Sequence, residues 1–97
     1  MYLIKSMGIL FQWDINKAKT NALKHKVSFE EAATVFGDNR SITIDDFAHS
    51  AYEKRKITIG KSANNHIIVI VHTERGQHIR IISARRASKK ERKQYEE

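Results

Sequence analysis

The sequence predicts an α+β fold in which two helices near the amino terminus pack on an antiparallel β-sheet meander, as a single domain over residues 1–97. Apolar residues recur at helical spacing between residues 15 and 37, and at strand spacing between residues 41 and 85. A chain of 97 residues supports one modest hydrophobic core. We therefore expect the element order β-α-α-β-β-β-β-α, ending in a short helix.

The first helix is expected to follow a short strand. Aromatic and β-branched residues at Ile9–Trp13 predict the strand, and Asp14 then offers a side-chain oxygen to the free amides of a helix over Ile15–His25. Lys26 stands where a left-handed residue would close this helix, at a cost of about 1 kcal/mol relative to glycine. The expected buried stripe consists of Ile15, Ala18 and Ala22.

The second helix is expected to begin at a capping box. Ser28 would accept a hydrogen bond from a backbone amide, and Glu31 would accept one from the amide of Ser28. Gly37 is placed to end the helix. The apolar stripe of this helix is the clearest in the sequence and consists of Phe29, Ala32, Ala33 and Phe36.

Four strands are expected in the second half of the chain. Ser41–Phe47 alternates apolar and polar residues, as a half-buried strand does, and residues 48–53 form a polar connection. The dipeptides Asn64–Asn65 and Arg75–Gly76 tolerate turn geometry and separate later strands. These strands are predicted at Arg55–Lys61, His66–Thr73 and Gln77–Arg85.

Charge is divided unevenly along the chain. Residues 1–53 hold six basic and seven acidic side chains, whereas residues 54–97 hold twelve basic and four acidic ones, and the formal net charge is +7. Such a surplus favours a polyanionic partner, either nucleic acid or an acidic protein. A solubilising face would have the same composition, so charge alone leaves both interpretations open.

Several classes of protein are excluded or disfavoured by composition. The absence of cysteine excludes a disulfide framework, a thiolate zinc site and a cysteine nucleophile. The length excludes a large cofactor-binding enzyme, and the isolated glycines argue against a phosphate-binding loop. No stretch approaches the ~20 apolar residues of a membrane span, and residues 1–11 do not resemble a secretory signal. We therefore expect a cytoplasmic protein without a cofactor.

The predicted hairpin of the last two strands places His72 and Arg80 on opposite faces of the sheet. A tight turn at Arg75–Gly76 would pair Thr73 with His78, and paired residues share a face. His78 would then lie on the face of Arg80. The opposite face would carry His72, Ser83 and Arg85.

Arg80 and His72 each allow a structural and a functional interpretation. Arg80 stands among apolar neighbours and needs a partner, because an unpaired buried charge is too costly. It could recognise phosphate, for which a guanidinium is suited, or form a salt bridge to Asp45, Asp46 or Glu53. His72 could act as a general acid or base, or it could be a packed, hydrogen-bonded core residue.

The five histidines do not predict a metal site. His66 and His72 share a strand face but lie about 20 Å apart at ~3.3 Å per residue, too far to bind one ion. The sequence contains no HxH or HExxH spacing.

A basic run at residues 85–93 supplies most of the charge surplus. Part of it lies at the start of a short terminal helix, which a capping box of Ser88 and Glu91 begins and Tyr95 anchors. Six or seven contacts from this run to phosphates would make nucleic-acid binding steeply salt-dependent, whereas a merely solvated helix face would not. Few aromatic residues accompany the run, so base stacking is not expected.

Several motifs resemble those of the BrnT family of bacterial toxins in order and spacing. The first reads Trp13-Asp14-x-x-Lys17-x-x-x-Asn21-x-x-Lys24-His25-x-Val27-Ser28-Phe29-Glu30-Glu31-Ala32, followed by Phe36-x-Asp38. The later ones read Glu53-x-Arg55-x-x-x-Ile59-Gly60, His72-Thr73-Glu74-Arg75 and Arg80-Ile81-Ile82-Ser83-Ala84-Arg85-x-Ala87, with Glu91-Arg92 and Tyr95 after them.

The resemblance covers about residues 11–96 and departs at Lys26, where the family usually has glycine. Residues 1–8 lie outside it. We expect them to be an extension beyond the core, with Met7 as an alternative start.

The resemblance implies a ribonuclease toxin of a type II toxin–antitoxin system with a RelE-like fold, which inhibits translation and growth. It also implies a small antitoxin, BrnA, that neutralises the toxin and binds operator DNA, in an assembly of two toxins and two antitoxins. RelE-like enzymes need no metal, and the expected chemistry is attack of a ribose 2′-hydroxyl on the adjacent phosphate. Such a step needs a base, an acid and cations around the transition state.

Residue types suggest how these roles would be divided. The phosphate would be held by Arg55, Arg80 and Arg85, and protons would be moved by His72 or Glu53. Further RNA contacts are predicted at Arg75, Arg86, Lys89 and Lys90. The alternative functions are a non-catalytic basic module that binds an antitoxin or nucleic acid, and a purely structural interaction domain.

Overall fold

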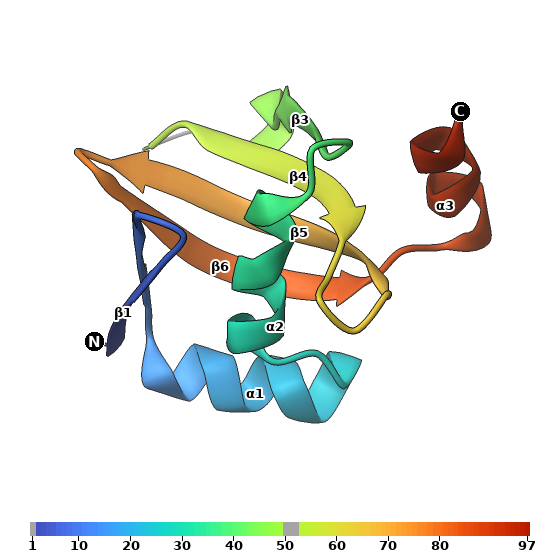
Figure 1. Ribbon diagram of the computed structural model, residues 1–97. Helices are drawn as coiled ribbons and strands as arrows, with labels where there is room; N and C mark the ends of the chain where they lie inside the picture. The colour runs from blue at the N-terminus through green and yellow to red at the C-terminus, as the bar shows by residue number, and fades with distance from the viewer. Residues whose placement is uncertain (1, 50–52) are drawn as a thin grey trace.

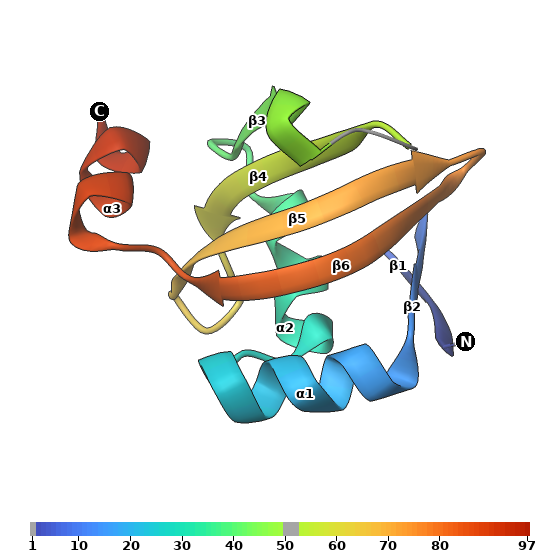
Figure 2. The ribbon, with the colours of Figure 1, turned by 180° about the vertical axis from the view of Figure 1, so that it is seen from behind.

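The structure is a computed structural model that describes residues 2–49 and 53–97. Within these residues, six strands form one mixed sheet, accompanied by three α-helices and two short 3₁₀ helices (Figures 1 and 2). The strands are β1 Tyr2–Ser6, β2 Ile9–Trp13, β3 Ile42–Asp45, β4 Arg55–Lys61, β5 Ile67–Arg75 and β6 His78–Arg86. The helices are α1 Ile15–His25, α2 Phe29–Thr34, α3 Lys89–Glu96, η1 Val35–Gly37 and η2 Phe47–His49.

The sheet has the strand order β1-β2-β6-β5-β4-β3. The strands β3 to β6 form the expected antiparallel meander, but β2 pairs with β6 in parallel, so the prediction of a wholly antiparallel sheet is wrong. The two strands are far apart in sequence, and α1 and α2 lie between them along the chain. Short-range patterns carry no information about such a pairing.

Strand β1 extends the sheet beyond β2. The two strands are antiparallel and are joined by a turn at Met7 and Gly8, which both have positive φ. Ile4 of β1 packs against the core. Residues 2–6, which were expected to lie outside the core, therefore form an edge strand.

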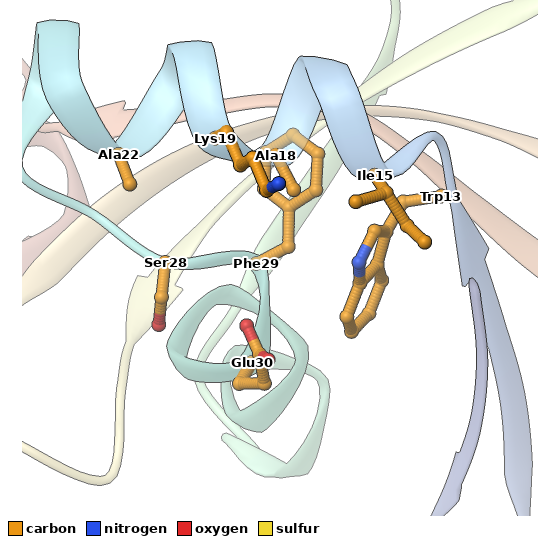
Figure 3. A pocket seen from close by; sticks show the side chains of 8 residues that line it. All are labelled: Trp13, Ile15, Ala18, Lys19, Ala22, Ser28, Phe29 and Glu30. Atoms are coloured by element: carbon orange, nitrogen blue, oxygen red, sulfur yellow. The ribbon is translucent and has the colours of Figure 1, made fainter. Parts of the chain in front are cut away.

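Helix α1 has the predicted caps. The Asp14 side chain accepts a hydrogen bond from the Lys17 amide, and Lys26 closes the helix in the left-handed conformation with φ of 59°. The predicted buried stripe is wrong for Ile15, which is 45% exposed, while Ala18 is partly buried against the core and the buried residue of the helix is Asn21. The expected stripe residues instead line an open hollow between α1 and the start of α2, beside Trp13 and Phe29 (Figure 3).

Asn21 explains the orientation of α1. Its Nδ2 donates to the carbonyls of Ala84 and Val27 at 2.8 and 3.1 Å, and its Oδ1 accepts from the Ala84 amide at 3.1 Å. The carboxamide thus occupies the edge of β6 at Ala84, beyond the stretch that β2 pairs with. Asn21 therefore faces inward, although the apolar pattern of the helix predicts other residues there, because these buried backbone groups need hydrogen-bond partners.

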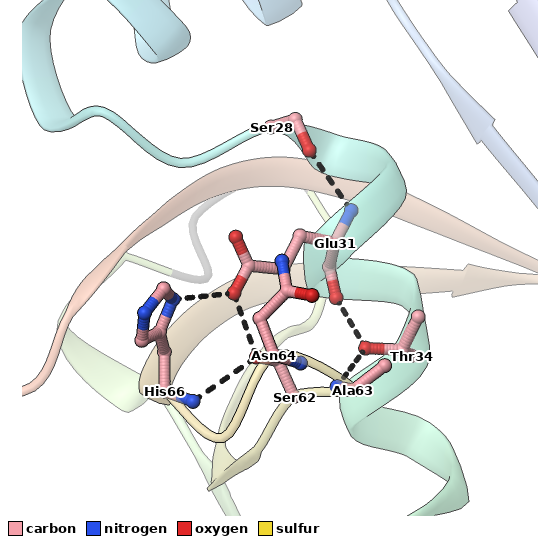
Figure 4. Close-up of polar contacts among 7 residues, drawn as sticks. All are labelled: Ser28, Glu31, Thr34, Ser62, Ala63, Asn64 and His66. Atoms are coloured by element: carbon pink, nitrogen blue, oxygen red, sulfur yellow. Dashed lines mark hydrogen bonds and ion pairs between the residues drawn. The ribbon is translucent and has the colours of Figure 1, made fainter.

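Helix α2 carries the predicted apolar stripe, with Phe29, Ala32 and Ala33 buried. Ser28 accepts the expected bond from the Glu31 amide. The other half of the predicted capping box is wrong, because the Glu31 carboxylate binds the Ser62 hydroxyl at 2.6 Å and His66 Nδ1 at 2.8 Å (Figure 4). Glu31 therefore attaches α2 to the turn between β4 and β5.

The core lies between the sheet and the first two helices. Trp13 meets Phe29 edge to face, and Phe11 packs against Phe36 at a ring-centroid distance of 5.4 Å. The buried apolar residues of this cluster are Phe11, Trp13, Val27, Phe29, Ala32, Ala33, Val35, Ile68, Ile70, Ile81 and Ala84. Because this face of the sheet is covered by α1, α2 and η1, we call it the helix face, and we call the other the open face.

The hairpin of β5 and β6 has a different register from the predicted one. Arg75 pairs with His78, so the loop is shorter than expected and Thr73 lies opposite Arg80 rather than His78. A bulge between Val71 and His72 on β5 leaves Ile82 of β6 as an extra residue. The β6 residues that follow Ile82 therefore face the side of the sheet opposite to the one that regular alternation along the strand predicts.

Helix α3 lies beyond the carboxyl end of β6 (Figures 1 and 2). It starts with the predicted capping box of Ser88 and Glu91, and the Tyr95 hydroxyl donates to Asp38 at 2.5 Å. No helix in the described part of the chain has the length and apolar character that a membrane span needs.

Candidate functional site

The open face carries a row of side chains that crosses four strands. Strand pairing places Arg55 of β4 beside Thr73 of β5, Thr73 beside Arg80 of β6, and Arg80 beside Gln12 of β2. Neighbours in register share a face, so these four residues lie side by side. We call them the arginine row.

The local sequence explains the position of Arg80. Its neighbours Ile79 and Ile81 pack with the core, so alternation directs Arg80 to the open face. Thr73, between the two arginines, is only 1% exposed, and its hydroxyl makes no hydrogen bond within residues 2–49 and 53–97. Two half-buried guanidinium groups therefore flank a buried hydroxyl.

Glu53 brings a carboxylate to the arginine row. It accepts two hydrogen bonds from Arg75, at 3.1 and 3.0 Å. These bonds hold the pKa of the Glu53 carboxyl below its usual range, and the charges of Arg80 and Arg55 lower it further. Glu53 is therefore ionised at neutral pH and lies within the electrostatic reach of all three arginines.

His78 and Gln12 were not predicted as site residues. Gln12 is buried, and its Nε2 lies 3.1 Å from Nδ1 of His78. The predicted shared face of His78 and Arg80 is confirmed by the register. The two-residue spacing on a strand was thus sufficient to place His78 in the site, whereas the parallel contact with Gln12 gave no sequence signal.

His72 does not join these residues. It pairs with Lys56 and Ile81 on the helix face and is 2% exposed. Its Nε2 lies 2.7 Å from Thr58 Oγ1, and its ring packs edge to face on Phe36. Burial lowers the pKa of His72 to about 4, so the imidazole is neutral at physiological pH. The predicted separation of His72 from Arg80 is therefore confirmed.

The bulge corrects the positions of Ser83 and Arg85. Both were expected on the face of His72. Their partners on β5, Val71 and Val69, instead lie on the sheet face opposite to His72. Ser83 and Arg85 therefore lie on the open face with Arg80. Arg85 binds Glu91 of α3 through two hydrogen bonds of 2.7 and 2.8 Å.

The predicted basic residues form two groups at opposite ends of the sheet. Arg55, Arg75 and Arg80 lie with Glu53 near the hairpin loop. Four residues on β5, about 13 Å at ~3.3 Å per residue, separate the row of Thr73 from that of Val69. The second group follows β6 into α3 and consists of Arg85, Arg86, Lys89 and Lys90.

The first group has the elements needed for phosphate chemistry. Guanidinium groups bind phosphate oxygens, while a carboxylate and an imidazole can exchange protons. Within the described residues, no three His, Asp or Glu side chains gather as a metal ion would require.

Comparisons with known proteins agree with the motifs. Residues 13–91 match the family described as the ribonuclease toxin, BrnT, of type II toxin–antitoxin systems. The fold is similar to the 1.1 Å crystal structure of the Brucella abortus ribonuclease toxin, BrnT, with a TM-score of 0.64 and 24% identity, covering 81% of this chain and 96% of that chain. A search of curated proteins found no match. The resemblance inferred from the sequence is thereby confirmed, and the chain belongs to the BrnT family of ribonuclease toxins of type II toxin–antitoxin systems.

Proposed function

We propose that this toxin is a metal-independent endoribonuclease whose catalytic centre is the arginine row with Glu53 and His78. The observation that carries the proposal is the Glu53 carboxylate, which Arg75 holds by two hydrogen bonds and which the charges of Arg80 and Arg55 on the open sheet face also reach. A ribonuclease needs such a combination, because the transition state gathers negative charge while protons move.

The proposed reaction is a transfer within the RNA chain. The ribose 2′-hydroxyl loses its proton to a base and its oxygen forms a bond to the adjacent phosphorus. The bond from phosphorus to the 5′-oxygen of the next nucleotide breaks, and that oxygen takes a proton from an acid. The products are a 2′,3′-cyclic phosphate and a 5′-hydroxyl, so no water is consumed.

The residues divide into two roles. Arg55 and Arg80 bind the oxygens of the scissile phosphate and stabilise its additional charge. The ionised Glu53 accepts the 2′-hydroxyl proton, and His78, held by Gln12, supplies a proton to the leaving oxygen. His72 is left out because it lies buried on the helix face. Arg75 orients Glu53, and Arg85, Arg86, Lys89 and Lys90 remain predicted RNA contacts at the far end.

A type II toxin implies an antitoxin partner. We propose a BrnA-like antitoxin that covers the basic open face in a complex of two toxins and two antitoxins and connects it to operator DNA. The toxin would act in the cytoplasm, where cleaved RNA stops translation and growth.

The test is cleavage of RNA by the purified toxin in EDTA, both free and on ribosomes. The expected products carry 2′,3′-cyclic phosphate ends, and E53Q and H78Q should each reduce the rate while the protein stays folded. Absence of cleavage both of free RNA and on ribosomes would refute the proposed ribonuclease activity. If, in addition, R80A and E53Q inhibit growth as strongly as the wild type does, the result favours the alternative function, a non-catalytic binding module.

A further inference from the structure

A groove lies between α1 and β6, next to the arginine row. Its volume is about 360 Å³. The two elements lie side by side (Figure 2). Hydrogen bonds of Asn21, in the later part of α1, connect the helix to Ala84 near the end of β6. Most of the residues that line it are polar or basic in type, among them Asn16, Lys17, Thr20, Lys24, His25 and Ser83, although their carbon atoms form much of its surface.

The groove continues from the arginine row. Gln12, paired with Arg80, lies on the strand that leads directly into α1. The hydrogen bond from the Lys17 amide lowers the pKa of the Asp14 carboxyl, and the charge of Arg80 contributes to the same shift, so the start of α1 lies near Arg80. The bulge places Ser83 on the face of Arg80. The lining of the groove includes Ile82, two residues after Arg80 on β6, and Asn16, at the start of α1, so one end of the groove lies near the row.

The helix that lines this groove has a basic surface. The first half of the chain has more acidic than basic side chains, yet α1 contains three lysines and no acidic residue. None of the ion pairs in the described part of the chain involves Lys17 or Lys24. Lys24 and His25 suit the carboxyl end of the helix dipole, but Lys17 stands in the first turn, where a cation is unfavourable. The charge of Asp14, whose carboxyl pKa Lys17 helps to lower, offsets part of this cost for Lys17.

We propose that this groove binds the single-stranded RNA backbone beside the scissile phosphate, with Lys17 and Lys24 contacting successive parts of the strand. The two lysines are seven residues apart, about 10 Å along the helix. Asn16, Thr20 and Ser83 supply hydrogen bonds between them. Continuity with the phosphate-binding row favours RNA over an acidic protein segment. The inference rests on the proposed ribonuclease function and extends its substrate surface onto α1.

The experiment measures binding separately from cleavage. A short fluorescent RNA in which every ribose is 2′-O-methylated binds without offering a nucleophile, and its affinity is followed by anisotropy over a range of salt concentrations. For K17A/K24A, we expect the slope of log K against log salt to shrink by about 1.4, at about 0.7 per lost contact. The control K19A/K26G removes the same charge from outside the groove and should leave the slope within error of the wild type.

A second variant guards against effects on folding. Glu at position 17 suits the helix dipole, so K17E should keep or raise the melting temperature while weakening RNA binding. Equal slopes in K17A/K24A and wild type would overturn the proposal, as would an equal decrease in the control. Unchanged RNA binding with weakened binding of the cognate antitoxin would assign the groove to the protein partner and also overturn it. Failure of the wild type to cleave unmodified RNA would refute the proposed function alone.

Discussion

His72 and Thr73 are consecutive residues of β5 in opposite environments. His72 faces α2 and η1 and packs on Phe36, whereas Thr73 faces the open side between Arg55 and Arg80. Each has a buried polar atom, Nδ1 or Oγ1, without a hydrogen bond in the described part of the chain. The surroundings of these atoms differ, because an aromatic ring covers one residue and cations flank the other.

The comparison separates the two faces of one sheet by their roles. The helix face holds the apolar cluster and a neutral histidine, so changes there should alter the free energy of unfolding. The open face holds arginines and Glu53, so changes to these charged groups should alter RNA cleavage. A mutation that affects both properties equally would argue against this division.

The largest expected effect is that of R80A on cleavage. Removing a cation that stabilises the transition state costs about 10² to 10³ in rate. R80K should recover part of the loss, because lysine retains the charge without the planar fork. The measurement is kcat/KM on RNA in EDTA, with the melting temperature as a check of folding.

Arg40 offers a matched control for Arg80. It is an exposed arginine in the loop after η1, outside the arginine row. R40A should cleave RNA at the wild-type rate. Equal losses in R80A and R40A would show that net charge, rather than the row, determines activity.

The next effect is a pH dependence that arises on the helix face. The folded-state pKa of His72, about 4, lies below the ordinary value of 6.5, so the unfolded chain binds more protons in this interval. Stability is fully present above pH 6.5 and decreases as pH falls towards 4, by about 1.4 kcal/mol per pH unit and about 3 kcal/mol in all. Denaturant unfolding of the wild type from pH 7 to pH 4 measures this loss.

H72Q provides the control for this titration, since glutamine does not titrate. Its free energy of unfolding should vary less between pH 6.5 and 4.5 than that of the wild type. The two curves would run parallel if other groups caused the loss. R80A should keep the wild-type pH dependence, because Arg80 lies on the other face.

Local patterns predicted much of this architecture. Side-chain caps act over three residues, so Asp14 and Ser88 were recognisable, and the strand Arg55–Lys61 was predicted with its observed bounds. Alternation along strands also separated His72 from Arg80 and placed His78 beside Arg80.

The errors arose where distant parts of the chain decide the structure. The parallel pairing of β2 with β6 and the inward turn of Asn21 both depend on the open edge of β6. The extra residue Ile82 reversed the expected face of Arg85, because one inserted residue changes the parity of every later side chain. The site was therefore predictable near the hairpin loop and not beyond the bulge.

A smaller effect is expected for T73V on the open face. Valine keeps the approximate shape of threonine but removes a buried hydroxyl that has no hydrogen bond in the described residues. Removing an unsatisfied group should raise the free energy of unfolding by about 1 kcal/mol. Denaturant unfolding measures the change. A destabilised variant would show that the hydroxyl has a partner in the folded protein.

The smallest effect is expected for Lys26, which ends α1 in the left-handed conformation with φ of 59°. Glycine adopts this conformation without the clash of a Cβ, although it also loses more entropy on folding, so K26G should stabilise the protein by about 0.5–1 kcal/mol. K26A is the matched control, because alanine removes the charge but keeps the strained conformation. Equal stabilisation in both variants would attribute the gain to charge. RNA cleavage should be unchanged in K26G, since a more stable helix face does not alter the arginines across the sheet.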